Sequence, residues 1–153
     1  MIKSIYKTKR MKYFSYLLLL LLYSVEGYAQ LHNKPLVDSL IATLPYQKED
    51  TNKVLVLHDI SFYYGKLSPD SGISYAQKEL VLARKIAWKK GEVKAYNNLG
   101  NSLNNKSNYP SALTNYFTSL RIAEEYNYKV EISKELGNIS LVYQAQKKVR
   151  QGD

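Results

Sequence analysis

Side chains that commonly carry out catalysis or hold metals are sparse in this sequence of 153 residues. It contains no cysteine, which excludes both a disulfide framework and a thiolate zinc site. Its two histidines, His32 and His58, lie in different segments and have no neighbour at a metal-site spacing. His58 precedes Asp59, but no nucleophile motif or phosphate-binding glycine loop accompanies the pair. The sequence therefore predicts no cofactor and no metal, and it favours a non-catalytic protein over a hydrolase.

Amide side chains are the polar type that is most concentrated, and they gather over residues 97–108. Six of these twelve residues are asparagine. Asparagine usually prefers helix caps and turns, because its side chain competes with helical hydrogen bonds. What these amides can do together depends on the element that carries them.

The first 29 residues have the organisation of a secretory signal peptide. Five lysine and arginine residues precede an apolar stretch over 13–25, which includes six consecutive leucines. Small residues at Gly27 and Ala29 precede Gln30, so we expect cleavage after Ala29 and export to the periplasm or outside the cell. A retained membrane anchor over 13–25 is the alternative, although this stretch is short for a span of about 20 residues.

The net charge of +9 belongs in large part to that leader. Without residues 1–29, 17 basic and 12 acidic residues leave a charge of +5. The lysines are spread along the chain, which indicates a solvated surface rather than a nucleic-acid patch. We therefore expect no nucleic-acid partner, and a basic RNA-binding helical repeat remains as the alternative.

Apolar residues recur at helical spacing through the rest of the chain, and no segment alternates with a period of two. This pattern predicts an all-α fold. A first helix is expected over 33–44, followed by a polar linker. Ser68 is the expected N-cap of a later helix, with Pro69 at its first position. Five further helices joined by short connections are predicted, which makes successive helices antiparallel neighbours; they cover 51–66, 69–88, 92–105, 112–125 and 131–147.

These helices repeat a two-helix unit with a period of forty residues. Leu80 and Ala83, for example, recur as Leu120 and Ala123. The middle copy resembles the tetratricopeptide repeat family, whose signature combines aromatic, Leu-Gly, large apolar and small residues over two helices. The residues that match are Tyr96, Leu99, Gly100, Leu103, Ala112, Tyr116 and Ser119.

The other two copies depart from the family pattern. In the first, Ser61 replaces the glycine and Glu79 stands where a small residue is usual. The third has only its first helix. The forty-residue period is similar to that of repeats in exported or periplasmic parts of bacterial sensor kinases and regulators.

The resemblance implies a right-handed superhelical array of antiparallel helix hairpins, an α-solenoid of about two and a half repeats. An N-terminal helix and linker would occupy 30–49, and the repeats would occupy 50–153 as 50–90, 91–130 and an incomplete 131–153. The last helix would lack its hairpin partner, which leaves Leu136, Ile139 and Tyr143 without cover. We expect further repeats beyond this helix, with self-association or a bend back onto its neighbour as alternatives.

The asparagines follow the helical period, because most of them lie opposite the face that carries Tyr96, Leu99 and Gly100. In the family this outward face of each first helix lines a concave groove that holds extended segments of a partner. The groove residues expected by the signature are Lys94, Asn97, Asn98, Asn101 and Asn105 in the middle copy, Lys134 and Asn138 in the third, and His58, Asp59 and Phe62 in the first.

An amide both donates and accepts, so a row of amides matches the N–H and C=O groups of an extended peptide backbone. Lys94 and Lys134 would favour a carboxylate or an acidic side chain. The alternative is that the asparagines serve solubility or hydrogen bonds between neighbouring helices. The sequence thus predicts an exported, non-catalytic module that binds a protein or peptide, as the input or scaffold part of a signalling or envelope assembly.

Overall fold

The computed structural model describes residues 34–152. The chain divides into two units, 1–36 and 37–153, and the packing described below is that of the second unit. The predicted signal segment, 1–29, and the alternative anchor within it lie outside the described residues. Over residues 34–152, no helix is long and apolar enough to cross a membrane.

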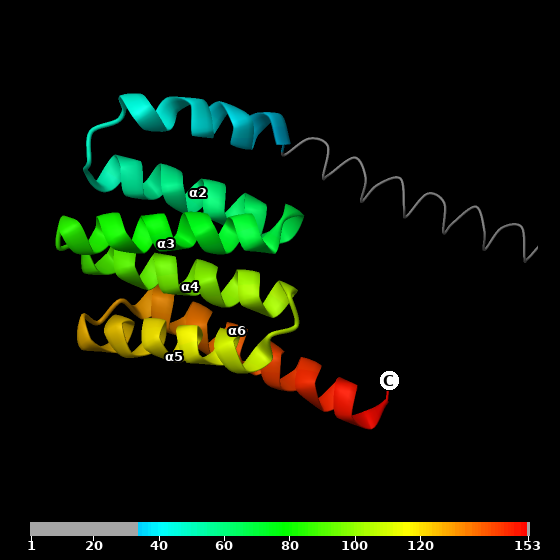
Figure 1. Ribbon diagram of the computed structural model, residues 1–153. Helices are drawn as coiled ribbons and strands as arrows, with labels where there is room; N and C mark the ends of the chain where they lie inside the picture. Colours follow the sequence, from blue (N-terminus) through cyan, green and yellow to red (C-terminus); the bar gives the residue numbers. More distant parts are fainter. Residues whose placement is uncertain (1–33, 153) are drawn as a thin grey trace, which may run out of the picture. The chain divides into compact units, whose positions relative to one another are not determined.

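The described residues are helical almost throughout and contain no strand, which confirms the all-α prediction. Residues 34–43 are helical and lead into a short 3₁₀ helix, η1 (Leu44–Tyr46). The α-helices that follow are α2 (Thr51–Leu67), α3 (Pro69–Lys85), α4 (Lys89–Asn105), α5 (Tyr109–Glu125) and α6 (Lys129–Gln151). Consecutive helices pack against one another, and α2 also packs against α4 (Figure 1).

The connections after α3, α4 and α5 are copies of one turn. Each contains a non-glycine residue with positive φ, at Ala87 (55°), Ser107 (57°) and Asn127 (54°). The next residue donates its N–H back into the preceding helix, as Trp88 does to the carbonyl of Ala83 at 2.8 Å. This Schellman-type closure reverses the chain directly after each helix and makes the helices antiparallel.

The same turns explain most of the differences between the predicted helix boundaries and the structure, whereas α6 continues to Gln151, beyond its predicted end at 147. The helix predicted over 69–88 ends at Lys85, because the turn begins there. The helices predicted to begin at 92, 112 and 131 begin two or three residues earlier, directly after the turn residues. Ser68 occupies the predicted N-cap position, but its hydroxyl lies 2.9 Å from Ser71 Oγ and makes no capping hydrogen bond to the backbone.

Close approach between α4 and α5 is made at Gly100. A Cβ atom on this residue would lie 2.5 Å from Cε1 of Tyr116, whose side chain is almost fully buried. The expectation that a small residue lets these helices cross closely is therefore confirmed. Tyr116 joins a core cluster with Leu120 of α5 and with Ile139 of α6.

The outer side of α6 is only partly covered. Leu136 is 53% exposed and Tyr143 is 51% exposed, as expected for residues without a hairpin partner. Ile139, which was expected to share their exposure, is instead buried against α5. α6 therefore uses one face to close the core and leaves a second face open.

Candidate functional site

Two carboxyl groups are buried beside α4. Glu79 of α3 is 0% exposed and Glu135 of α6 is 1% exposed. Burial away from water disfavours the charged form and raises the pKa of both carboxyl groups. Each group therefore depends on hydrogen bonds from its neighbours.

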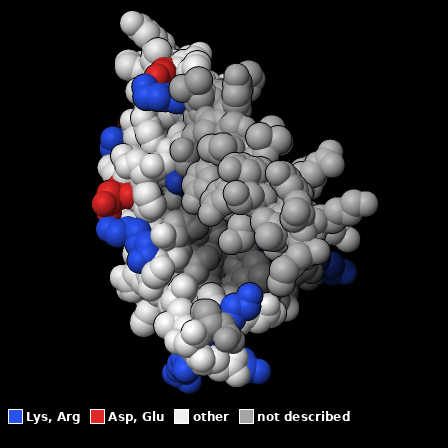
Figure 2. Space-filling view, turned by 90° about the vertical axis from the view of Figure 1, so that its right-hand side faces the viewer, with Lys and Arg blue, Asp and Glu red and all other residues white. Residues whose placement is uncertain are grey.

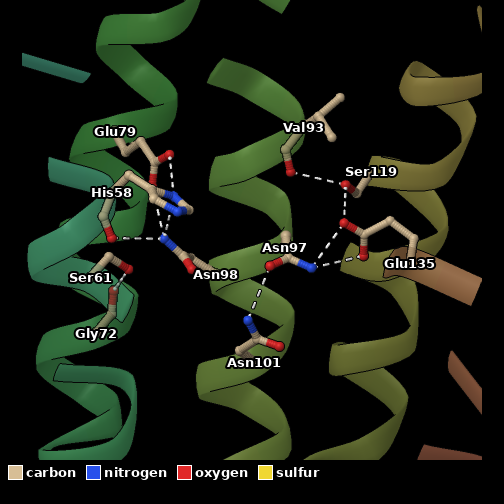
Figure 3. Close-up of polar contacts among 10 residues, drawn as sticks. All are labelled: His58, Ser61, Gly72, Glu79, Val93, Asn97, Asn98, Asn101, Ser119 and Glu135. Carbon is tan, nitrogen blue, oxygen red and sulfur yellow. Dashed lines mark hydrogen bonds and ion pairs between the residues drawn. The ribbon is translucent and has the colours of Figure 1, made fainter. Parts of the chain in front are cut away.

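The first cluster is built around Glu79 and joins three helices (Figure 3). His58 Nδ1 of α2 lies 3.2 Å from Glu79 Oε1. Asn98 Nδ2 of α4 donates to Glu79 Oε2 at 3.2 Å and to the carbonyl oxygen of His58 at 3.0 Å. Asn98 thus connects α4 both to the carboxyl group and to the residue forty positions earlier.

The second cluster is built around Glu135. Asn97 Nδ2 donates to its two carboxyl oxygens at 2.9 and 3.0 Å. Ser119 Oγ of α5 lies 2.9 Å from Glu135 Oε1. Asn101 Nδ2 donates to Asn97 Oδ1 at 3.1 Å, and the hydroxyl of Tyr116 donates to Asn101 Oδ1 at 2.8 Å. These contacts connect α4, α5 and α6 (Figure 3).

The asparagine face is therefore less open than its helical position predicts. Asn97 and Asn98 are each 1% exposed. They are buried because Glu135 and Glu79 approach α4 from its two sides and require amide donors. Asn105 Nδ2 likewise donates to the carbonyl oxygen of Gly65 at 2.8 Å. For these three asparagines, hydrogen bonding between neighbouring helices, which the sequence left open as the alternative, is what the structure shows.

A hollow of about 250 Å³ lies beside this network, between α2, α4 and α6. Six of the ten residues expected in the groove line it: Phe62, Asn98, Asn101, Asn105, Lys134 and Asn138. The other four expected residues, Lys94, Asn97, His58 and Asp59, do not line it. The structure thus gathers residues from the first helices of all three predicted repeats around one space.

Several lining residues were missed in the sequence: Ser61, Gly65, Lys66, Ser102 and Asn104. Ser102 follows Asn98 by four residues, a spacing that places both on one helical face and that the sequence already contained. Its hydroxyl packs against two glycines, because a Cβ atom would lie 3.0 Å from Ser102 Oγ at Gly65 and 2.6 Å from it at Gly72. The glycines leave the room that Ser102 occupies.

The charged residues that line the hollow are all basic. Lys66 and Lys134 line it, and none of its lining residues is acidic. On the face seen in Figure 2, the Lys and Arg side chains of the described residues lie at separate points rather than in one continuous patch. This distribution agrees with a solvated surface.

Groups that would hold a metal ion are not assembled in the part of the chain that is described. Within residues 34–152, no set of three or more His, Asp or Glu side chains is placed to hold a metal ion. His58, which precedes Asp59 in the sequence, makes its contacts with Glu79 and Asn98.

No family model matches this chain, and no curated protein matches it at a significant level.

Proposed function

We propose that this protein is a tetratricopeptide-like module whose hollow binds an extended segment of a partner protein. The observation that carries the proposal is the hollow itself, which is lined from α2, α4 and α6, the first helices of the three predicted repeats. Such helices line the groove of a superhelical array. In this proposal the hairpins wind into a right-handed array around the hollow.

The lining chemistry indicates what kind of segment would fit. Asn98 Oδ1 of α4 offers an acceptor and Asn138 Nδ2 of α6 offers a donor, and the backbone of an extended peptide can pair with both. Lys66 and Lys134 add positive charge without an acidic neighbour in the hollow. A segment with an acidic side chain or a terminal carboxylate next to its contact with α6 would therefore be favoured.

The cellular role follows from the leader. We propose that residues 1–29 direct export, and that the remaining chain acts as the input or scaffold part of a signalling or envelope assembly. The open face of α6, with Leu136 and Tyr143, would then provide a second contact surface, for a further repeat or for another copy of the chain. No catalytic step is assigned to the protein.

Selection from a random peptide library tests this function. We expect peptides that bind the purified protein with a dissociation constant in the micromolar range, and about tenfold weaker or worse to Lys134→Glu, because the substitution reverses a charge at the hollow. Lys129→Glu is the matched control, since it changes another exposed lysine of α6 outside the hollow. Failure to enrich any peptide, or equal losses in both variants, would refute the proposal.

A further inference from the structure

Three side-chain atoms of residues that line the hollow are buried without a hydrogen-bond partner, Asn98 Oδ1, Ser102 Oγ and Asn138 Nδ2, and the first two belong to neighbouring turns of α4. Asn98 is 1% exposed and Ser102 is 0% exposed, and both residues line the hollow. Neither Asn98 Oδ1 nor Ser102 Oγ has a hydrogen-bond partner among the described residues. Buried polar atoms in proteins are almost always paired, because leaving them unpaired costs free energy. These two are therefore placed to meet groups that a ligand brings.

Asn98 offers only an acceptor to the hollow. Its Nδ2 lies 2.9 Å from His58 Nδ1, 3.0 Å from the carbonyl oxygen of His58 and 3.2 Å from Glu79 Oε2, so both of its protons are engaged. Turning the amide over would set Asn98 Oδ1 against two other oxygen acceptors. The unpaired atom is thus the oxygen, and a ligand must supply an N–H or O–H donor to it.

Ser102 adds a hydroxyl one helical turn from Asn98, and a hydroxyl can donate or accept. The surrounding charge restricts the choice of ligand further. Lys66 and Lys134 repel a cationic donor such as an ammonium group. A carboxylate brings no proton for Asn98 Oδ1 and would be repelled by that oxygen. A neutral group with a donor beside an acceptor satisfies both atoms.

From this complementarity we infer that Asn98 and Ser102 form a subsite for a primary carboxamide, such as the side chain of an asparagine or glutamine. Its NH₂ group donates to Asn98 Oδ1, and its carbonyl oxygen accepts from the hydroxyl of Ser102. The inference rests on the proposed function in that the carboxamide belongs to the segment held in the hollow. It adds a specificity for neutral amides that the two lysines alone would not produce.

Three small probes of similar size test the subsite by NMR titration of the ¹⁵N-labelled protein: propionamide, propionate and propylammonium. Propionamide is expected to cause saturable shifts of the Asn98 side-chain NH₂ and the Ser102 backbone N–H, with affinity about tenfold above that of either charged probe. Ser102→Ala should remove this preference and leave the protein folded, because the substitution deletes only an unpaired hydroxyl. Ser133→Ala, on the exposed side of α6 and outside the hollow, is the matched control and should keep the preference.

An equal response to all three probes, or no response to any of them, overturns the subsite, because Asn98 Oδ1 and Ser102 Oγ would then be hydrogen-bonded by water. A mixture of random octapeptides separates this result from a failure of the proposed function. If the mixture shifts resonances of Phe62 and Lys134 while propionamide does not, only the carboxamide subsite falls. If neither probe has an effect on the hollow, both proposals fall.

Discussion

At the scale of single residues, the asparagines of α4 act as donors to neighbouring helices. Asn98 and Asn105 each reach a backbone carbonyl forty positions earlier, at His58 and Gly65. Their helical face was predictable from their spacing. Their burial was not, because it depends on Glu79 and Glu135, which come from other helices. The position of Glu79 could have indicated an unusual contact, because the repeat usually has a small residue there.

The buried carboxyl groups predict that stability falls as pH rises. Burial raises the pKa of Glu79 and Glu135 above the unfolded value, although His58, Lys94 and Lys134 act in the opposite direction. Below the ordinary carboxyl pKa both states are protonated. Above it the unfolded chain releases its protons first, so the free energy of unfolding falls until the folded groups ionise as well.

Urea denaturation between about pH 4 and about pH 8 measures this dependence around the ordinary carboxyl range. The combined Glu79→Gln and Glu135→Gln variant should show a flatter decline than the wild-type protein. Glu124→Gln, an exposed change on α5, should keep the wild-type slope. An unchanged slope in the double variant would show that the two groups ionise as freely when folded as when unfolded.

Alanine substitutions at two glycines are predicted to change the free energy of unfolding in opposite directions. Gly100→Ala should lower the free energy of unfolding by about 1 to 3 kcal/mol, because its Cβ would overlap the ring of Tyr116. Gly137→Ala on α6 has nothing within 4 Å and should raise it by up to about 1 kcal/mol through helix propensity. Thermal or urea unfolding checks both. Similar effects of the two substitutions would contradict the close crossing of α4 and α5.

At the scale of elements, the sequence predicted the number and order of the helices after residue 50 but misplaced several ends. Apolar periodicity identifies a helix by its buried face, and this face says little about the first and last turns. The turns themselves also have no clear signature in the amino-acid sequence. Their left-handed positions hold Ala87, Ser107 and Asn127 rather than glycine. Asparagine at 127 is compatible with this conformation, whereas alanine at 87 and serine at 107 give no sign of it, so these two turns are recognised only in the structure.

Ala87 predicts a gain in stability from a turn substitution. Alanine in a left-handed conformation is strained by about 1 to 2 kcal/mol, and glycine is not, although glycine loses more entropy on folding. Ala87→Gly should therefore raise the free energy of unfolding by up to about 1 kcal/mol. Asn127→Gly should give a smaller gain, because asparagine tolerates this conformation. Urea midpoints report both values, and a loss at Ala87 would count against the turn geometry.

At the scale of the whole molecule, helical periodicity was enough for the all-α class, and the repeat spacing was enough to bring six expected residues to one hollow. The burial of each side chain could not be predicted from this spacing. Asn97 is buried by Glu135 of α6, a contact between helices that the forty-residue period does not describe. The open side of α6 likewise depends on what α5 leaves uncovered. Spacing along a helix predicts the face on which a side chain lies, whereas packing against other helices determines how exposed that side chain is.

The most direct test of the hollow as the binding surface uses the absence of cysteine from the sequence. A single cysteine introduced as Phe62→Cys, in the hollow, or as Phe117→Cys, on α5, can carry a fluorophore. The two positions are matched in chemistry and exposure, at 41% and 47%. A library-selected peptide that carries a quencher should quench the label at position 62 and leave the label at position 117 unchanged. Quenching at position 117 with none at position 62 would contradict the account.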